Sequence, residues 1–150
     1  MRTGTSFARD WQLIKVARSL QRQDVAGSLV QKLLLDAPPG LTERIAVIAR
    51  RLGEENGTQL LTHAEERLDP PTLMEGLLLT WGIPCEATDA ADGGVAIAVD
   101  GAATVVREAF ADIRVAEPYL EGYARALQRD AVLVHGGGGR MTIRFPPRNE

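Results

Sequence analysis

Apolar positions recur at helical spacing in the first half of the chain and alternate at strand spacing in several later segments. Stripes with a three-four period predict helices over residues 6–23, 25–34, 42–68 and 73–81. Proline-rich breaks at residues 37–40 and 69–71 separate the last three of these stripes, because proline disfavours the helix interior and the residue before it. The first half is therefore predicted to be helical throughout.

After Ile83 the pattern predicts two hairpins with helical segments between them. In residues 95–99 the β-branched residues alternate with alanines, as in a strand that has one buried face. The predicted strands cover residues 85–89, 95–99, 131–135 and 141–145. Turn signals lie at 91–94 and 136–139, and helices are predicted over 104–111 and from Glu117-Pro118 onward, with proline at the tolerated first position.

This order of elements predicts an α+β fold within one domain spanning residues 1–150. Residues 1–40 form N-terminal helices, and residues 41–146 form the core of one long helix and the sheet. The predicted architecture is a helical N-terminal half followed by a small antiparallel sheet of two hairpins, with helices packed on one face. A doubly wound parallel sheet is disfavoured because the short turns cannot make crossover connections.

The long helix carries two different stripes. Ala46, Ala49, Gly53 and Gly57 share one face, where small side chains permit close approach of another backbone or of a flat ligand. Each glycine inside a helix costs about 0.5–1 kcal/mol relative to alanine, so two of them indicate a packing reason. A neighbouring stripe is predicted to be core, and its members are Leu41, Ile45, Ile48 and Leu52.

Composition narrows the class of protein. A hydrophobic content of 45% with 25% charged residues is typical of globular domains. The net charge of −3 argues against a nucleic-acid partner, and the longest apolar run, Leu77–Leu79, is too short for a membrane span. The N-terminus has no apolar signal core, so we expect a cytoplasmic location. A single cysteine excludes an internal disulfide.

Residues with catalytic potential are few. His63 fits a solvated helix end better than a metal ligand, since its spacing matches no helical metal motif. Cys85 is interpreted as an inert thiol, and a Cys85–His135 nucleophile pair would require their two strands to be adjacent. The four glycines at 136–139 are interpreted as a flexible hairpin loop and not as a phosphate site, because no helix follows them.

Aromatic residues offer a second kind of site. Tyr119 and Tyr123 are four residues apart on the last helix and, with Trp81, form either core or the wall of a ligand pocket. Gly122 lies between the two tyrosines and again removes bulk. Arg50 flanks the small-residue face, where it is either solvated or in reach of an anionic ligand.

With these elements in place, the chain resembles the 4-vinyl-reductase-type domain family of small-molecule-binding proteins over about residues 41–146. The resemblance rests on Arg50-x-x-Gly53-x-x-x-Gly57, on the segment Leu77–Ile83 that leads into a strand, and on the helix segment Tyr119–Tyr123 before the closing hairpin. The family is related in fold to subunits of a vesicle-tethering complex. The resemblance implies a protein that binds hydrocarbons, pigments or other small ligands, acts as a sensor domain and forms dimers.

The chain departs from the family at its cysteines. Members often carry one after the second strand and others near the last helix and the final hairpin. Here the corresponding residues 100–103, 116–118 and 136–139 contain no cysteine. A metal or reactive-thiol function carried by such residues is therefore not predicted.

We therefore predict a non-catalytic small-molecule-binding or sensor domain that acts as a homodimer and takes a small apolar or aromatic ligand. The candidate ligand-binding residues are Arg50, Gly53, Gly57, Trp81, Tyr119 and Tyr123. No catalytic residue or metal ligand is assigned, and the cofactor is left open. The alternatives are a small hydrolase-like enzyme that uses Cys85 or His135, and a protein–protein interaction module that uses the N-terminal helices over residues 6–36.

Overall fold

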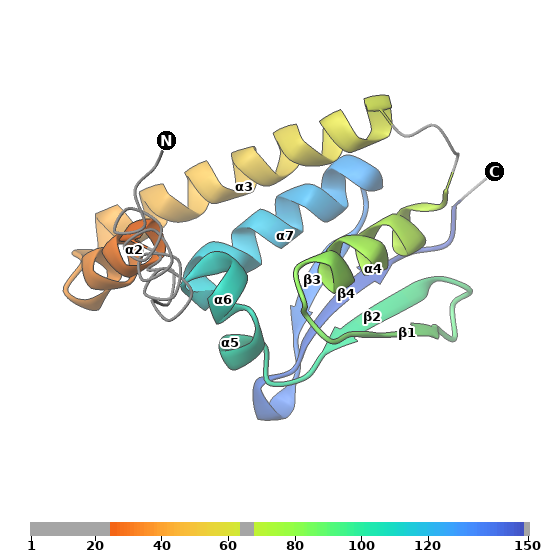
Figure 1. Ribbon diagram of the computed structural model, residues 1–150. Coiled ribbons are helices and arrows are strands. Elements are labelled where there is room, and N and C mark those ends of the chain that lie inside the picture. Colours follow the sequence, from red (N-terminus) through yellow and green to blue (C-terminus); the bar gives the residue numbers. More distant parts are fainter. Residues whose placement is uncertain (1–24, 64–67, 149–150) are drawn as a thin grey trace, which may run out of the picture.

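The computed structural model describes residues 25–63 and 68–148, so the helix predicted over residues 6–23 lies outside the described part. The major helices are α2 (Val25–Leu35), α3 (Pro39–His63), α4 (Pro70–Thr80) and α7 (Ile113–Leu127), with short helices α5 (Ala102–Val105) and α6 (Arg107–Phe110). The strands are β1 (Glu86–Asp89), β2 (Val95–Val99), β3 (Val132–His135) and β4 (Met141–Phe145), and a 3₁₀ turn spans Gly137–Gly139. The predicted α+β fold is confirmed (Figure 1).

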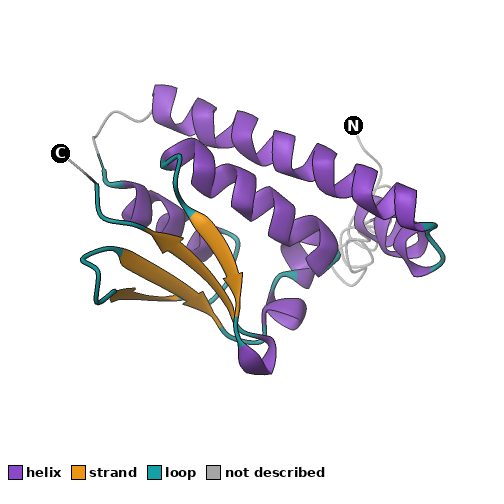
Figure 2. Cartoon of the chain, turned by 180° about the vertical axis from the view of Figure 1, so that it is seen from behind, coloured by secondary structure: helices purple, strands orange, loops and turns teal. Residues whose placement is uncertain are grey.

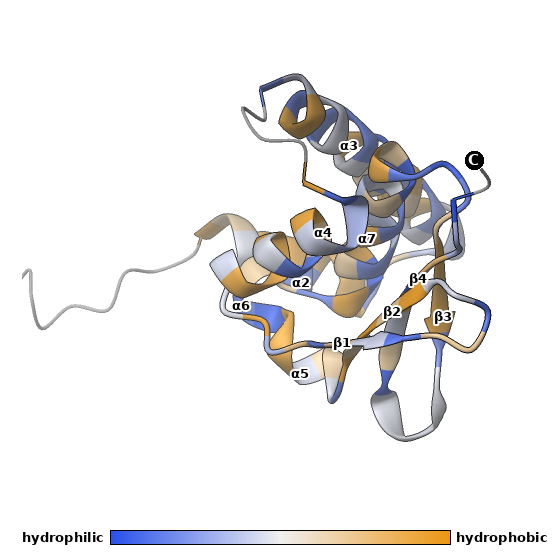
Figure 3. Ribbon diagram, turned by 90° about the vertical axis from the view of Figure 1, so that its right-hand side faces the viewer, coloured by the Kyte–Doolittle hydropathy of each residue, from blue (hydrophilic) through white to orange (hydrophobic). Residues whose placement is uncertain are grey.

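The four strands form one antiparallel sheet in the order β1-β2-β4-β3. Each predicted hairpin is present, and the two hairpins join through β2 and β4, where Ile97 lies opposite Ile143. The helices cover one face of this sheet (Figures 2 and 3). Strands β1 and β3 are consequently the two edges.

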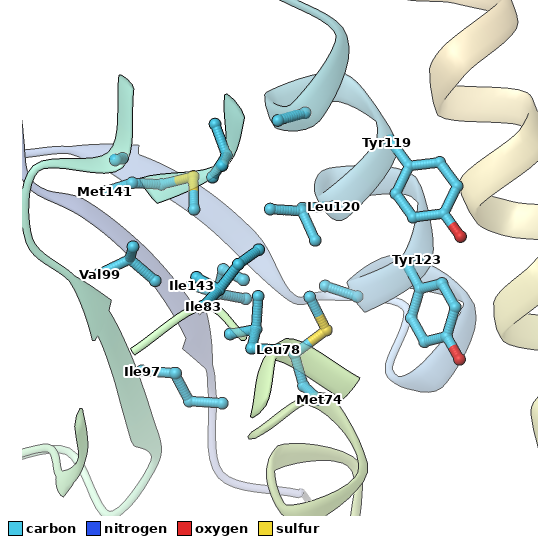
Figure 4. Packing of buried hydrophobic residues seen from close by; sticks show 14 of the residues in the cluster. Met74, Leu78, Ile83, Ile97, Val99, Tyr119, Leu120, Tyr123, Met141 and Ile143 are labelled. Atoms are coloured by element: carbon cyan, nitrogen blue, oxygen red, sulfur yellow. The ribbon is translucent and has the colours of Figure 1, made fainter. Parts of the chain in front are cut away.

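The main core lies between the sheet and the helices α4 and α7. Alternate residues of β4 are buried, namely Met141, Ile143 and Phe145, and they face the helix side. Leu120 of α7 points toward the same core, whereas Tyr119 and Tyr123 point toward α3 (Figure 4). Helix α7 is therefore the central element, in contact with the sheet on one side and with α3 on the other.

Helices α3 and α7 approach so closely that their backbones touch. A Cβ atom added to Gly53 would overlap the carbonyl group of Tyr119, and one added to Gly122 would overlap the carbonyl group of Arg50. At Gly57 the nearest atoms would be the Ala126 Cβ at 2.7 Å and the Tyr123 carbonyl oxygen at 2.9 Å. Of the two roles that the small-residue stripe allowed, the structure shows close approach of another backbone.

The neighbouring apolar stripe of α3 is not core, so that prediction is wrong. Ile48 is 58% exposed and Leu52 is 47% exposed, while Leu41 and Ile45 are half-buried. The reason is that α7 occupies the glycine face and leaves the large side chains on the adjacent flank. There Ile45, Ile48 and Leu52 line a cavity, which is described below.

Several helix starts differ from prediction, and those of α3 and α7 differ for clear reasons. Helix α3 begins at Pro39 and not at Thr42, since proline at the first helical position lacks an N–H that would have no partner there anyway. Helix α7 begins at Ile113, and Asp112 caps it by accepting a hydrogen bond from the backbone N–H of Arg114 at 2.8 Å. Pro118 therefore lies inside this helix and is buried. Asp112 is the sequence feature that would have predicted this earlier start.

Helix α4 is present where its apolar stripe predicts a helix, but it begins at Pro70, inside the predicted break, and ends at Thr80. Asp69 caps its start by accepting from the backbone N–H of Thr72 at 2.7 Å, and two prolines follow at the first helical positions. Gly82 ends the helix in the left-handed region, at a φ of 70°. The next residue, Ile83, is fully buried, and Trp81 is left at the surface of the core, where it faces α6 and α7.

Candidate functional site

A cavity of about 630 Å³ lies between α2, α3 and the segment that leads into α7. Helix α2 contributes one wall and the large-residue flank of α3 contributes another. Because Ile48 and Leu52 remain partly exposed, the cavity opens to solvent. The lining residues used below are Val30, Leu33, Ile48, Leu52, Asn56, Trp81, Phe110, Ala111 and Tyr119.

Three aromatic rings form the inner wall of this cavity. Trp81 and Phe110 meet edge to face with ring centroids 4.9 Å apart and an interplanar angle of 86°. Tyr119 lies 5.3 Å from Phe110 and 5.6 Å from Trp81, also measured between ring centroids. These separations are in the favourable range for aromatic pairs, so the rings support one another as a stiff apolar surface.

One polar pair interrupts the apolar lining. The side-chain amide of Asn56 donates a hydrogen bond from Nδ2 to the Tyr119 hydroxyl oxygen over 2.8 Å. Among the described residues, the Tyr119 hydroxyl proton and the side-chain carbonyl oxygen of Asn56 have no further partner and could bond a ligand. Among the described residues that line this cavity, none carries a charge.

The predicted site residues are divided among several places. Trp81 and Tyr119 line the apolar cavity, whereas Tyr123 is buried one turn further along α7, beside Tyr119 with ring centroids 6.0 Å apart. Burial and the nearby Tyr119 raise the pKa of Tyr123 to about 12. Gly53 and Gly57 lie in the contact between α3 and α7.

Arg50 belongs to a different, polar cavity of about 430 Å³ on the other flank of α3. Its guanidinium group donates to one carboxylate oxygen of Glu121 over 2.8 and 3.0 Å. In the same cavity His135 Nδ1 lies 3.3 Å from a carboxylate oxygen of Glu117, and burial raises the pKa of Glu117, opposed by His135. The structure thus separates Arg50 from Trp81 and Tyr119.

The structure does not bring Cys85 and His135 together. Cys85 immediately precedes β1 at one edge of the sheet, and His135 ends β3 at the other edge. Three strand spacings of about 4.8 Å separate these edges, or about 14 Å, which is too far for a nucleophile–base contact. Burial, with a smaller effect from Glu75, raises the pKa of the Cys85 thiol and so opposes formation of a thiolate.

His63 is exposed at the end of α3, where its Nδ1 lies 2.8 Å from the Gln59 carbonyl oxygen. Over residues 25–63 and 68–148, no group of three or more His, Cys, Asp or Glu residues is placed to hold a metal ion. The described helices also include none that is long and apolar enough to cross a membrane.

Sequence reasoning missed Asn56, Phe110 and the lining residues of α2. For Asn56 a signal existed, because it extends the stripe of Ile48 and Leu52 by one further turn as a polar residue. Phe110 had no such signal, since its position follows from the turn between α6 and α7. Helix α2 was recognised as a helix, but its pattern does not say which element it faces.

A scan against models of known protein families finds no match, and searches of curated proteins and of solved structures find none either. The resemblance to 4-vinyl-reductase-type domains therefore stays a prediction from the sequence.

Proposed function

We propose that this chain is a non-catalytic small-molecule-binding domain whose site is the apolar cavity between α2, α3 and Tyr119. The observation that carries the proposal is the cavity itself, of about 630 Å³, with apolar walls and a single polar pair. Sites for small molecules have volumes of about 300–1,000 Å³ and combine apolar walls with a few placed polar groups.

The lining favours a neutral, largely apolar or aromatic ligand. A charged group placed against these walls would lose its hydration without gaining an opposite charge. Asn56 and Tyr119 together offer one acceptor and one donor, so they suit a ligand with a single hydroxyl or amine group. The three-ring wall of Trp81, Phe110 and Tyr119 suits a flat ring system.

The first experiment is native mass spectrometry of the protein purified without added ligand, compared with its denatured mass. Extra mass that is lost on denaturation identifies a retained ligand and gives its mass. The same spectrum reports the oligomeric state, which tests the proposed homodimer. Large exposed apolar residues on α2 and α3, among them Leu29 and Val47, are consistent with such an interface.

The second experiment tests the location of the site with N-phenyl-1-naphthylamine, a neutral fluorescent aromatic amine. Ile48→Trp places bulk on the cavity wall and is expected to weaken probe binding about tenfold or more. Val47→Trp is the matched control, because Val47 is equally exposed, at 60%, but does not line the cavity. Equal loss in both variants, or no saturable binding to the wild type, would contradict the proposal.

A further inference from the structure

Helix α2 differs from the other walls of the apolar cavity in how it is held. Its one buried residue is Leu34, which lies outside the main core cluster, while Val25, Leu29 and Leu35 are exposed. The opposite walls are fixed by the backbone contact between α3 and α7 and by the aromatic rings. An element with few buried contacts opens at a lower free-energy cost than the body of the domain.

Among the described residues, two side-chain hydrogen bonds connect α2 to the turn before α7 and to the first turn of α7. Gln31 donates from Nε2 to the Ala111 carbonyl oxygen over 2.7 Å. Arg114 donates from Nη1 to the Leu34 carbonyl oxygen over 3.0 Å, and Asp112 orients this guanidinium through its Nε and Nη2 atoms at 2.9 and 3.0 Å. Both bonds involve residues in the second half of α2, next to its connection with α3.

The backbone at Ala111, which accepts the hydrogen bond from Gln31, is strained. Ala111 has a φ of 65°, and the N–H of Asp112 bonds the carbonyl of Phe110 over 2.7 Å, which closes a three-residue γ-turn. This turn is rare for a residue with a side chain, and it persists only where its surroundings hold it. Ala111 also lines the cavity, so the fastening point of α2 is part of the site wall.

We propose that α2 is a lid on the apolar cavity, held closed by Gln31 and Arg114 and opening about the connection at residues 36–38. The inference rests on the proposed ligand-binding role of that cavity and adds how a ligand enters it. Val30 and Leu33 form the cavity side of the lid. A ligand that fills the cavity contacts the closed lid, so opening precedes both entry and release.

The test compares probe-binding kinetics of the wild type and Gln31→Ala. The lost hydrogen bond destabilises the closed lid to the same extent with and without ligand. Stopped-flow mixing with N-phenyl-1-naphthylamine is therefore expected to show association and dissociation rates that both rise about fivefold, while Kd stays within about twofold. Arg114→Gln removes the second bond and is expected to act in the same direction.

Gln128→Ala is the matched control. Gln128 makes the same kind of bond, from its amide to the Pro146 carbonyl oxygen over 2.7 Å, far from the cavity. Its rates should equal those of the wild type. An unchanged association rate in Gln31→Ala with a weaker Kd would overturn the proposal, since α2 would then be a fixed wall that contacts the ligand.

A separate measurement keeps the lid testable if the probe fails to bind, which would count against the proposed function alone. Hydrogen exchange of the free protein should rise in residues 25–35 of Gln31→Ala and stay unchanged in α3 and α7. An increase spread over the whole chain would overturn the lid, because α2 would then open only together with the domain.

Discussion

The two flanks of α3 show opposite ways of using a helix face. On one flank, glycines let the backbone of α7 touch the backbone of α3, and a Cβ on Gly53 or Gly122 would have no room. On the adjacent flank, Ile48 and Leu52 are large, apolar and half-exposed, and a cavity lies between them and α2. On α3 the smallest residues are therefore buried and the large apolar ones are partly exposed. The reason is that α7 packs against the face of α3 that allows the closest approach.

The strongest test of this comparison adds one methyl group to the close flank of α3, the glycine face that contacts α7. Gly53→Ala places a Cβ against the Tyr119 carbonyl, a backbone atom that cannot move without shifting α7. We expect the free energy of unfolding to fall by about 3 kcal/mol or more, measured by urea denaturation. Gly122→Ala should behave alike, since its Cβ meets the Arg50 carbonyl.

Gly76 supplies the control for those variants. It lies in α4 with nothing within 4 Å of an added Cβ, so Gly76→Ala should stabilise the protein by about 0.5–1 kcal/mol through helix propensity. A Gly53→Ala variant as stable as the wild type would show that the two backbones do not touch in solution.

The second prediction concerns the open flank. Leu52→Ala is expected to cost only about 1 kcal/mol, because its side chain is 47% exposed and already borders a cavity. Leu78→Ala in the fully buried core of α4 should cost about 2–5 kcal/mol. Equal losses in the two variants, compared by thermal or urea unfolding, would mean that α2 closes onto Leu52 and fills the space.

The third and smallest effect concerns Tyr123, which lies one turn after Tyr119 on α7 and faces the close flank of α3 (Figure 4). The pKa of Tyr123 is raised to about 12 from an unfolded value of 10.0, so its contribution to stability is complete below pH 10 and is lost as the pH rises through 12. Ultraviolet titration of tyrosinate should show an ionisation near pH 12 in the wild type. Tyr123→Phe should lack this step, and its persistence there would contradict the assigned burial.

Much of the fold followed from local patterns. Alternation in residues 95–99 predicts a strand, and the structure confirms it. Residues 69–71 were predicted only as a break between helices, whereas in the structure Asp69 also caps α4 and the two prolines begin it. Pro118 led to a predicted helix start that is too late, because a proline inside a helix is normally disfavoured by about 3 kcal/mol. In the structure it is buried inside α7, where packing holds it.

The candidate site was only partly predictable, because it depends on which elements become neighbours. The helical spacing of Tyr119 and Tyr123, together with the aromatic Trp81, predicts either core or a pocket wall, and Trp81 and Tyr119 both line the cavity. Arg50 was grouped with them from its place on α3, but a shift of a few residues around a helix carries a side chain to another flank. Distances across the sheet, such as that between Cys85 and His135, require the strand order, which no local pattern contains.

The glycine contact between α3 and α7 also has a consequence for molecular discrimination. It fixes the distance between α3 and α7 through backbone atoms, which do not adapt, while on the other side of the cavity two side-chain hydrogen bonds among the described residues hold α2. Under the proposed ligand-binding role, a substituent directed at Tyr119 in a homologous series of ligands would meet an abrupt size limit. A chain that lengthens toward Val30 would lose affinity gradually, so the proposed site would be strict in shape at one end of the ligand and lenient at the other.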